Sequence, residues 1–278
     1  MSPTALRLIS WNIAGKVKAN PEQVAALETR SPDLLALQEV RLNALRRLEP
    51  LLVAVGLPHV TESVHLASER GFTYGEIIAS RWPLQQIPGP GEPNRFPERV
   101  LSASVDTPCG PLELHTAHIV PGVSNGYKKI EMFEAIYRRL AHHPNVLRIL
   151  CGDFNTPQAE TSEGRVITWG EKIRSDGRIE IVAGYERWDA GERSVLQGLA
   201  PFDLPDVFRA LNGYGVEAYS WVHKTKYGVT KRRFDHVFAS QSLNPVECRY
   251  LTDLVDAGLS DHAAIEALFS PLPTRSST

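Results

Sequence analysis

The stretch VLRILCGDFN, residues 146–155, indicates the fold. Its first six residues are apolar apart from one arginine, as in a strand that is buried on both faces. The strand ends at Gly152, and two polar residues, Asp153 and Asn155, follow it directly. The clearest helical spacing of apolar residues lies just before it, over residues 126–142. We therefore expect a helix followed by a buried strand, with polar groups where the strand stops.

Strands and helices are also predicted on both sides of this stretch. Short apolar or alternating segments predict strands at residues 5–11, 33–38, 74–79, 100–105, 112–118, 218–222, 234–239, 247–251 and 263–269. Helical spacing predicts helices at residues 21–30, 42–55 and 205–211, whereas residues 156–204 predict loops and short helices. Two halves with both kinds of element predict an α/β (α+β) fold, with β-sheets packed face to face and helices outside. Since no linker or repeat is evident, residues 1–278 are expected to form one domain, with an ordered core over about 5–270 and a flexible tail at 271–278.

The composition excludes several classes of protein. Of 278 residues, 42% are hydrophobic and 22% are charged, which is typical of a globular chain and not of a disordered, fibrous or membrane protein. The 30 Lys and Arg nearly balance the 32 Asp and Glu, so a globally basic nucleic-acid-binding domain is excluded and only local basic patches remain. The three cysteines have no CxxC spacing, which argues against a disulfide framework and a thiolate zinc site. Because the first ten residues lack a signal-peptide pattern, we expect a cytoplasmic protein without membrane contact.

Polar residues recur where the predicted strands begin or end. The set is Asn12, Glu39, His118, Asp153, Asn155, Asp235, Asp261 and His262. Strand ends placed side by side would gather these groups into one cleft, where carboxylate and amide oxygens suit a hard cation and histidines suit proton transfer. Each residue alone is more simply a turn former, a cap or a core residue. The whole set indicates a metal-dependent hydrolase and no more than that.

Six short motifs resemble, in their order, the motif series of the endonuclease/exonuclease/phosphatase superfamily. They are SWN at 10–12, LQE at 37–39, TAH at 116–118, GDFN at 152–155, RFDH at 233–236 and SDH at 260–262. The series covers nearly the whole chain. The resemblance implies a four-layer α/β/β/α sandwich of two mixed β-sheets, one or two Mg²⁺ or Mn²⁺ ions, and hydrolysis of a phosphoester.

The resemblance also implies a metal site and a general base. Glu39 would be the principal metal ligand, with Asn12 and Asp261 adjoining the metal. His262 would take the proton from the attacking water, and Asp235 would hold its imidazole in the right tautomer and orientation. With a divalent ion neutralising the phosphoryl oxygens, these roles form a coherent mechanism.

Further roles follow from the same resemblance. Asp153 and Asn155 would position the nucleophile and the phosphate, and His118 would contact the phosphate or help the leaving group. Glu76 or Glu69 could pair with His118, and the sequence leaves both open. In abasic-site enzymes the position of His118 is typically a tyrosine, whereas the deoxyribonuclease and sphingomyelinase branches have histidine.

The nearest resemblance is to the bacterial exonuclease and abasic-site endonuclease branch. It is carried by Ser220-Trp221, a basic segment and Arg233-Phe234-Asp235. Residues 231–236 lack the Trp-Cys-Asp-Arg motif of inositol-polyphosphate 5-phosphatases, and a signal peptide typical of secreted sphingomyelinases and pancreatic-type deoxyribonucleases is missing. Ala14 replaces an acidic or amide residue common in the branch, which leaves the number of metals open.

A basic segment at residues 223–233 contains no acid and predicts contact with nucleic acid. Its expected substrate-binding residues are Lys224, Lys226, Tyr227, Lys231 and Arg232, with Trp221 beside it, and Arg233 could add to them. Lys128 and Lys129, at the start of the helix predicted at 126–142, could form a second contact. Trp82 and Trp169 are expected to be packing residues. The leading hypothesis is a monomeric phosphodiesterase without an obligate protein partner that acts on nucleic acid, DNA before RNA. The alternatives are a phosphoesterase of small-molecule or lipid substrates, and a non-catalytic binding module of the same fold.

Overall fold

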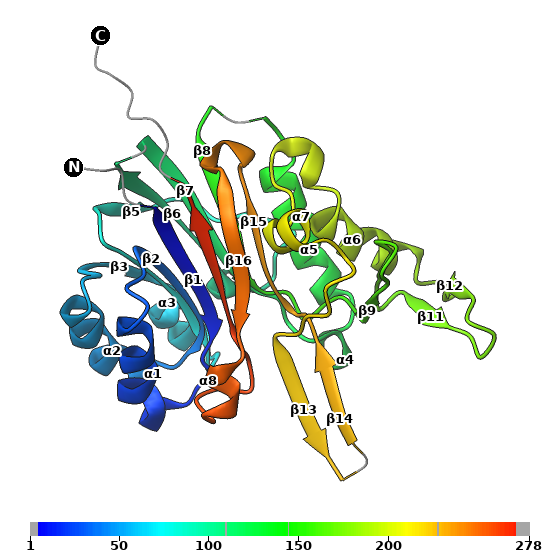
Figure 1. The fold of residues 1–278 in the computed structure, drawn as a ribbon, viewed down its shortest axis with the longest axis horizontal. Coiled ribbons are helices and arrows are strands. Elements are labelled where there is room, and N and C mark those ends of the chain that lie inside the picture. Colours follow the sequence, from blue (N-terminus) through cyan, green and yellow to red (C-terminus); the bar gives the residue numbers. More distant parts are fainter. Residues whose placement is uncertain (1–4, 109, 144, 227, 271–278) are drawn as a thin grey trace.

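Two mixed β-sheets form the centre of the molecule (Figure 1). The computed structural model describes residues 5–108, 110–143, 145–226 and 228–270. In spatial order, the six-stranded sheet contains β16 (Pro245–Leu251), β17 (Ala264–Phe269), β1 (Leu6–Asn12), β2 (Leu34–Val40), β4 (Gly75–Ser80) and β3 (His59–Glu62). The five-stranded sheet contains β15 (Asp235–Ala239), β8 (Leu147–Asp153), β7 (Gly110–His118), β6 (Val100–Thr107) and β5 (Leu84–Gln86). Strand β1 is parallel to β2, and β7 is parallel to β8, whereas the other neighbours are antiparallel.

The strands are buried on both faces because each sheet packs against the other sheet and against helices. In β1, Leu8 lies in the core between the sheets, while Ile9 and Trp11 face the helices. The same alternation occurs in β8, where Ile149 faces the other sheet and Leu150 faces helices. This two-sided burial explains the nearly continuous apolar runs of the sequence. The predicted α/β/β/α sandwich is confirmed.

Helices cover the outer faces of both sheets. The six-stranded sheet is covered by α1 (Asn20–Glu28) and α2 (Leu42–Ala54), with α3 (Val64–Glu69) beside β4. The five-stranded sheet is covered by α5 (Lys128–Leu140) and α6 (Glu186–Leu196). The shorter helices are α4 (Gly122–Asn125), α7 (Val207–Asn212), α8 (Asp253–Asp256) and the 3₁₀ turns Val17–Ala19, Pro97–Arg99, Ala200–Phe202 and Gln241–Leu243.

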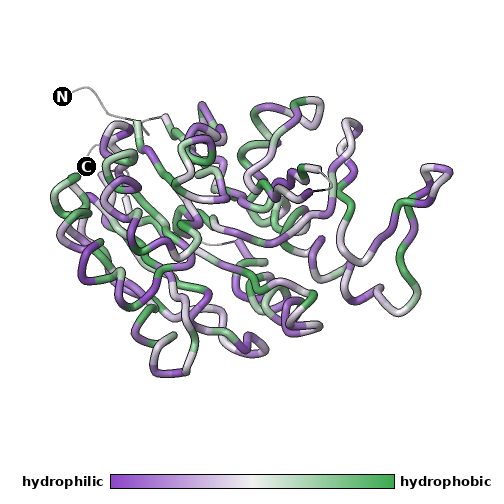
Figure 2. The backbone as a smooth tube through the Cα atoms, turned by 90° about the horizontal axis from the view of Figure 1, so that it is seen from below, coloured by the Kyte–Doolittle hydropathy of each residue, from purple (hydrophilic) through white to green (hydrophobic). Residues whose placement is uncertain are grey.

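The described helices include none that is long and apolar enough to cross a membrane. Figure 2 shows hydrophobic and hydrophilic residues alternating along the chain, without a long uninterrupted hydrophobic segment. Cys151 is a buried free thiol, as predicted, because it faces the core between the two sheets.

The middle of the chain differs most from its prediction. Helix α6 falls inside residues 156–204, together with four short strands, β9 (Ala159–Glu160), β10 (Val166–Ile167), β11 (Glu171–Ile173) and β12 (Ile179–Ile181). The sequence of α6 contains several charged residues and Gly191, so its buried face is not evident from the pattern of apolar residues. Gly191 is required by close packing, since a Cβ there would lie 2.5 Å from Cγ2 of Ile130 in α5. The charged face and this glycine therefore mask a helix that buries against its neighbour.

The basic segment is a hairpin and not a loop. Strand β13 (Trp221–Thr225) pairs antiparallel with β14 (Gly228–Arg232), and the two project beyond the sandwich in Figure 1. The strand predicted at residues 218–222 begins three residues later than expected. Exposure of the hairpin explains the miss, because strands without a buried face need no apolar alternation.

Candidate active site

Strand pairing gathers the polar residues at one end of the sandwich. In the five-stranded sheet, Asp153 at the end of β8 lies opposite His118 of β7 and Asp235 of β15. In the six-stranded sheet, Asn12 ends β1 beside the last residues of β2. His262 precedes β17 and forms a backbone bridge with Trp221. The site is therefore built from both sheets, at the ends of their central strands.

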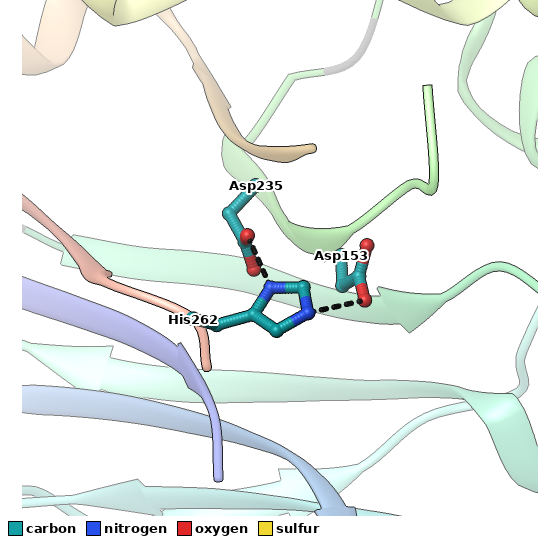
Figure 3. A group of neighbouring side chains, drawn as sticks. All are labelled: Asp153, Asp235 and His262. Atoms are coloured by element: carbon teal, nitrogen blue, oxygen red, sulfur yellow. Dashed lines mark hydrogen bonds and ion pairs between the residues drawn. The ribbon is translucent and has the colours of Figure 1, made fainter. Parts of the chain in front are cut away.

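His262 and Asp235 form a buried dyad (Figure 3). Nδ1 of His262 lies 2.8 Å from Oδ2 of Asp235, and its Nε2 lies 3.7 Å from Oδ2 of Asp153. The backbone of His262 is also fixed, since the indole nitrogen of Trp11 donates to its carbonyl oxygen at 2.9 Å. The backbone N–H of His262 donates to the hydroxyl oxygen of Ser260, and this hydroxyl donates to the carbonyl oxygen of Asn12. The imidazole is thus held with Nε2 toward Asp153.

Carboxylates dominate the electrostatics of this dyad. Burial lowers the pKa of His262, but Asp235 and Asp153 outweigh burial and raise it to about 10. Burial raises the pKa of Asp153 to about 7, although the neighbouring His262 lowers it. Within the described part of the chain, Asp153, Asp235 and His262 bring one ligand atom each within 4.8 Å of one another. A protonated His262 compensates part of this buried negative charge, and a bound cation would compensate it further.

The residues present fit a divalent cation. The side-chain amide of Asn12 donates to Oδ2 of Asp153 at 2.9 Å and to Oε1 of Glu39 at 3.2 Å, so the two carboxylates lie on either side of it. Oδ1 of Asp235 is buried and has no hydrogen-bond partner among the described residues. Oxygen-rich donor sets of this kind suit Mg²⁺ and Mn²⁺. The amide group of Asn12 is itself fixed, because its oxygen accepts the backbone N–H of Ala14. It can therefore hold the two carboxylates in place.

The backbone aims Glu39 at this site. The pairing of β2 with β4 shifts register between Leu37 and Val40, and Glu39 adopts a positive φ of 58°. A bulge of this kind redirects one side chain at the end of a strand. Asp261 is exposed, and its charge contributes to raising the pKa of His262. Its role as a metal ligand stays a prediction.

One ring nitrogen of His118 contacts a cation, and the other faces two carboxylates. Its Nδ1 lies 2.5 Å from Nη1 of Arg99, whereas Nε2 lies 3.5 Å from Oε1 of Glu39 and 3.8 Å from Oδ2 of Asp153. Burial, Arg99 and His262 hold the pKa of His118 well below its usual range. Glu76 is buried in β4, and neither of its carboxylate oxygens has a hydrogen-bond partner in the part of the chain described. The sequence left Glu76 and Glu69 open as partners of His118, and in the described part of the chain Arg99 contacts its Nδ1 instead.

Asn155 is fixed from several directions. Its φ is 50°, its backbone N–H donates to Oδ1 of Asp153, and its amide donates to the carbonyl oxygen of Ile119. Its own carbonyl oxygen accepts from Nζ of Lys129 at 2.9 Å and from the indole of Trp169 at 3.0 Å. These contacts over-determine a left-handed backbone that a non-glycine residue rarely adopts.

Lys129 has a structural role and does not reach the surface where a phosphate could bind. Its side chain is 1% exposed, and Nζ lies 2.6 Å from Oε1 of Glu192. Glu192 also accepts the indole N–H of Trp188, the hydroxyl of Thr156 and the backbone N–H of Trp169. The expectation for Lys129 is wrong because α6, which the sequence concealed, brings Glu192 over it.

The basic hairpin divides into surface and interior residues. Lys226 and Lys231 are exposed, Arg232 is half-buried, and Nζ of Lys231 lies 4.0 Å from the ring centroid of Tyr219. The side chain of Lys224 and all of Tyr227 lie outside the described residues. Lys128 is exposed at the first residue of α5. Trp221 is half-buried and stacks on Phe234, with ring centroids 5.3 Å apart.

Arg233 does not belong to that surface. It is buried, and its guanidinium binds Glu160 at 2.7 Å and Asp206 at 2.9 Å. The expectation that it contacts substrate is wrong, since a residue following an exposed strand turns inward here.

An aromatic cleft adjoins the site and was not predicted. Its volume is about 550 Å³, and its lining includes Asn155, Tyr127, Trp169, Tyr185, Trp188 and Phe234. Trp169 is 37% exposed, so it lines this cleft and is not the packing residue expected. The signal in the sequence was the density of aromatic residues between 169 and 188, which no motif explains.

Comparison with known proteins identifies the family. Residues 9–262 match the Endonuclease/Exonuclease/phosphatase family. The chain belongs to this family. Its members hydrolyse phosphoester bonds and typically bind divalent cations, so the predicted enzyme class is confirmed.

Three proteins show what this chain is similar to. Exodeoxyribonuclease III of Haemophilus influenzae is 24% identical over 286 residues, which cover 95% of this chain and all of the relative. An AP endonuclease from Archaeoglobus fulgidus has 18% identity and a TM-score of 0.69, over 95% and 99% of the two chains. D. rerio TDP2, complexed with a single strand DNA product, has 20% identity and a TM-score of 0.66, over 96% and 99%. This chain is thus similar in fold and length to enzymes of the exonuclease and AP endonuclease branch.

Proposed function

We propose that this enzyme is a Mg²⁺- or Mn²⁺-dependent phosphodiesterase that cleaves nucleic acid, DNA in preference to RNA. The observation that carries the proposal is the buried His262–Asp235 dyad beside Asp153, at the strand ends that also hold Asn12 and Glu39. The relatives are an exodeoxyribonuclease, an AP endonuclease and a protein bound to a DNA product, which supports a nucleic-acid substrate.

The dyad supplies the base. Because Asp235 engages Nδ1 of His262, Nε2 is the nitrogen that accepts the proton of an attacking water. Asp153 and Asn155 orient the water and the phosphate, with Asn155 held by the backbone contacts described above. Glu39 and Asp153 would hold the cation, with Asn12 between them and Asp261 adjoining. When bound, the cation neutralises charge on the phosphoryl oxygens.

Two surfaces beside the dyad support a nucleic-acid substrate. The exposed cations of the β13–β14 hairpin, including Lys226 and Lys231, can bind backbone phosphates. The aromatic cleft shares Asn155 with the active site and offers rings on which a base or sugar packs. The expected monomeric state and cytoplasmic location stay predictions.

Cleavage assays test this function. Labelled single-stranded, duplex and abasic DNA, and RNA, are incubated with Mg²⁺, Mn²⁺ or a chelator. We expect metal-dependent cleavage of DNA that Glu39→Ala and His262→Ala abolish, whereas exposed Glu22→Ala and His142→Ala leave it unchanged. Absence of cleavage of every nucleic acid, or cleavage that survives both active-site variants, would refute the proposal.

Salt dependence tests the hairpin separately. Neutralising Lys226 and Lys231 together should weaken DNA binding and make the slope of log K against log salt shallower by about 0.7–0.9 for each phosphate that is no longer neutralised. The matched control neutralises Lys172 and Arg174 of the β11–β12 hairpin, which pair with Glu180. Equal slopes for the wild type and the first variant, with turnover of a small or lipid phosphoester, would favour the alternative substrate class.

A further inference from the structure

The pairing of His118 with Arg99 restricts the chemistry of the histidine. Nη1 of Arg99 lies 2.5 Å from Nδ1 of His118. An arginine guanidinium has only N–H donors and stays charged in proteins, so Nδ1 must present its lone pair to Arg99. A neutral imidazole with an accepting Nδ1 carries its proton on Nε2. The contact therefore fixes one tautomer of His118.

The proton of this tautomer points into the active site. Nε2 of His118 lies 3.5 Å from Oε1 of Glu39 and 3.8 Å from Oδ2 of Asp153, so it faces the space that these two carboxylates border. The ring is 5% exposed in its side chain and cannot turn freely toward solvent. An N–H at this place is suited to donate a hydrogen bond to a phosphoryl oxygen.

Arg99 is itself held in place by aromatic and charged neighbours. Its guanidinium carbon lies 5.4 Å from the ring centroid of Tyr74, and that of Arg41 lies 5.1 Å from the same ring. Arg41 also donates to the hydroxyl of Tyr74 at 2.9 Å. The buried carboxyl group of Glu76, in β4, interacts electrostatically with Arg99. The guanidinium is therefore pre-positioned behind His118 and is not a mobile surface group.

We propose that Arg99 is a positioning residue that keeps His118 as a hydrogen-bond donor, through Nε2, to a phosphoryl oxygen of the substrate. The substrate contact rests on the proposed function, whereas the Arg99–His118 restraint does not.

Nitrogen NMR tests the restraint without any substrate. The full-length protein with ¹⁵N-labelled histidine is compared with Arg99→Met, Arg99→Lys and the exposed control Arg95→Met, and the His118 signals are assigned by their loss in His118→Tyr. We expect an unprotonated Nδ1 and a protonated Nε2 in the wild type and in Arg95→Met. Arg99→Met should shift both signals, and Arg99→Lys should restore them in part. A proton on Nδ1 in the wild type, or an Arg99→Met spectrum identical to that of the wild type, overturns the proposal.

Kinetics test the consequence for catalysis. If His118 acts as a neutral donor, His118→Tyr should retain much of kcat, whereas His118→Ala should lose about 10²-fold. Arg99→Met should lower kcat more than it raises KM, and Arg95→Met should change neither. Equal loss in His118→Tyr and His118→Ala would overturn the donor role. If no nucleic acid is cleaved by the wild type, the proposed function fails while the NMR comparison still decides the role of Arg99.

Discussion

The contacts of the imidazole ring of His262 determine whether this residue can act as a base. Its Nδ1 is bound to Asp235, and two carboxylates raise its pKa to about 10 against the lowering effect of burial. A histidine accepts a proton only when it is neutral, so activity must fall as pH drops through its pKa. A cation bound among the same carboxylates would offset their charge and lower that pKa.

Replacing Asp235 by Asn tests this assignment. The change removes an anion that raises the pKa of His262, so the acid limb of the pH–rate profile should move to lower pH. The rate on the plateau should fall by about 10²-fold or more, because the imidazole loses the partner that fixes its tautomer. Asp106→Asn, at an exposed position in β6, serves as the control. An acid limb that stays at the same pH in Asp235→Asn would remove His262 from the role of base.

Neighbouring residues also show where prediction from sequence reaches its limit. Lys128 and Lys129 are alike in the sequence, yet one is exposed and the other is buried against Glu192, 63 residues away along the chain. Arg232 is half-buried, whereas Arg233 is buried against Glu160. Burial of a charged side chain depends on a distant partner, and one sequence does not reveal that pairing.

At the scale of elements, the α5–α6 contact contains a buried ion pair. Glu192→Leu should destabilise the protein by about 3–5 kcal/mol, because Lys129 would remain buried without its partner. The double variant Lys129→Met/Glu192→Leu should recover much of this loss. Urea unfolding measures both changes. A double variant that is less stable than Glu192→Leu would contradict the explanation.

The same two helices offer a matched control. Arg187 of α6 and Glu134 of α5 form an ion pair at 2.8 Å, with side chains 54% and 30% exposed. Exposed pairs contribute little, so Glu134→Ala should cost about 0–1 kcal/mol. A loss as large as that in Glu192→Leu would mean that the helix contact, and not the burial of charge, determines the effect.

Elements with buried, apolar faces were predictable, and the others were not. The strands β1, β2, β7 and β8 follow the sequence closely because both faces of each are apolar, and the polar residues at their ends include Asn12, Glu39, His118 and Asp153. Asp235 and His262 begin or precede strands that were also expected. Helix α6 was missed because its buried face itself contains charged residues, Asp189 and Glu192, and strand β14 was missed because it is mostly exposed. The aromatic residues between 169 and 188 were visible in the sequence, but their place in one cleft depends on α6, which was not predicted.

At the scale of the whole molecule, a buried charge network links the middle of the chain to the C-terminal half. Glu160 of β9 binds Arg209 of α7 at 2.8 Å and Arg233 at 2.7 Å. Burial would raise the pKa of Glu160, but the two arginines outweigh burial and lower it from 4.5 to about 2. A lowered pKa stabilises the folded state above pH 4.5, and this stabilisation disappears as pH falls from 4.5 toward 2.

Glu160→Gln tests the network through the pH dependence of stability. The shift corresponds to about 3 kcal/mol, so the wild type should lose that much more unfolding free energy than Glu160→Gln as the carboxylate is protonated. Urea unfolding between about pH 7 and pH 2 provides the comparison, with exposed Glu28→Gln as the control. Parallel pH profiles for the wild type and Glu160→Gln would show that the pair does not stabilise the fold.

The division of the site between two sheets has a mechanical consequence. Asn12 and Glu39 belong to the six-stranded sheet, whereas Asp153 and Asp235 belong to the five-stranded sheet. A cation bound by residues of both sheets would link the two halves of the sandwich and stabilise their packing. Free cation should then raise the melting temperature with its concentration, and chelation should loosen the strand ends first, which hydrogen exchange at residues 12, 39 and 153 can follow.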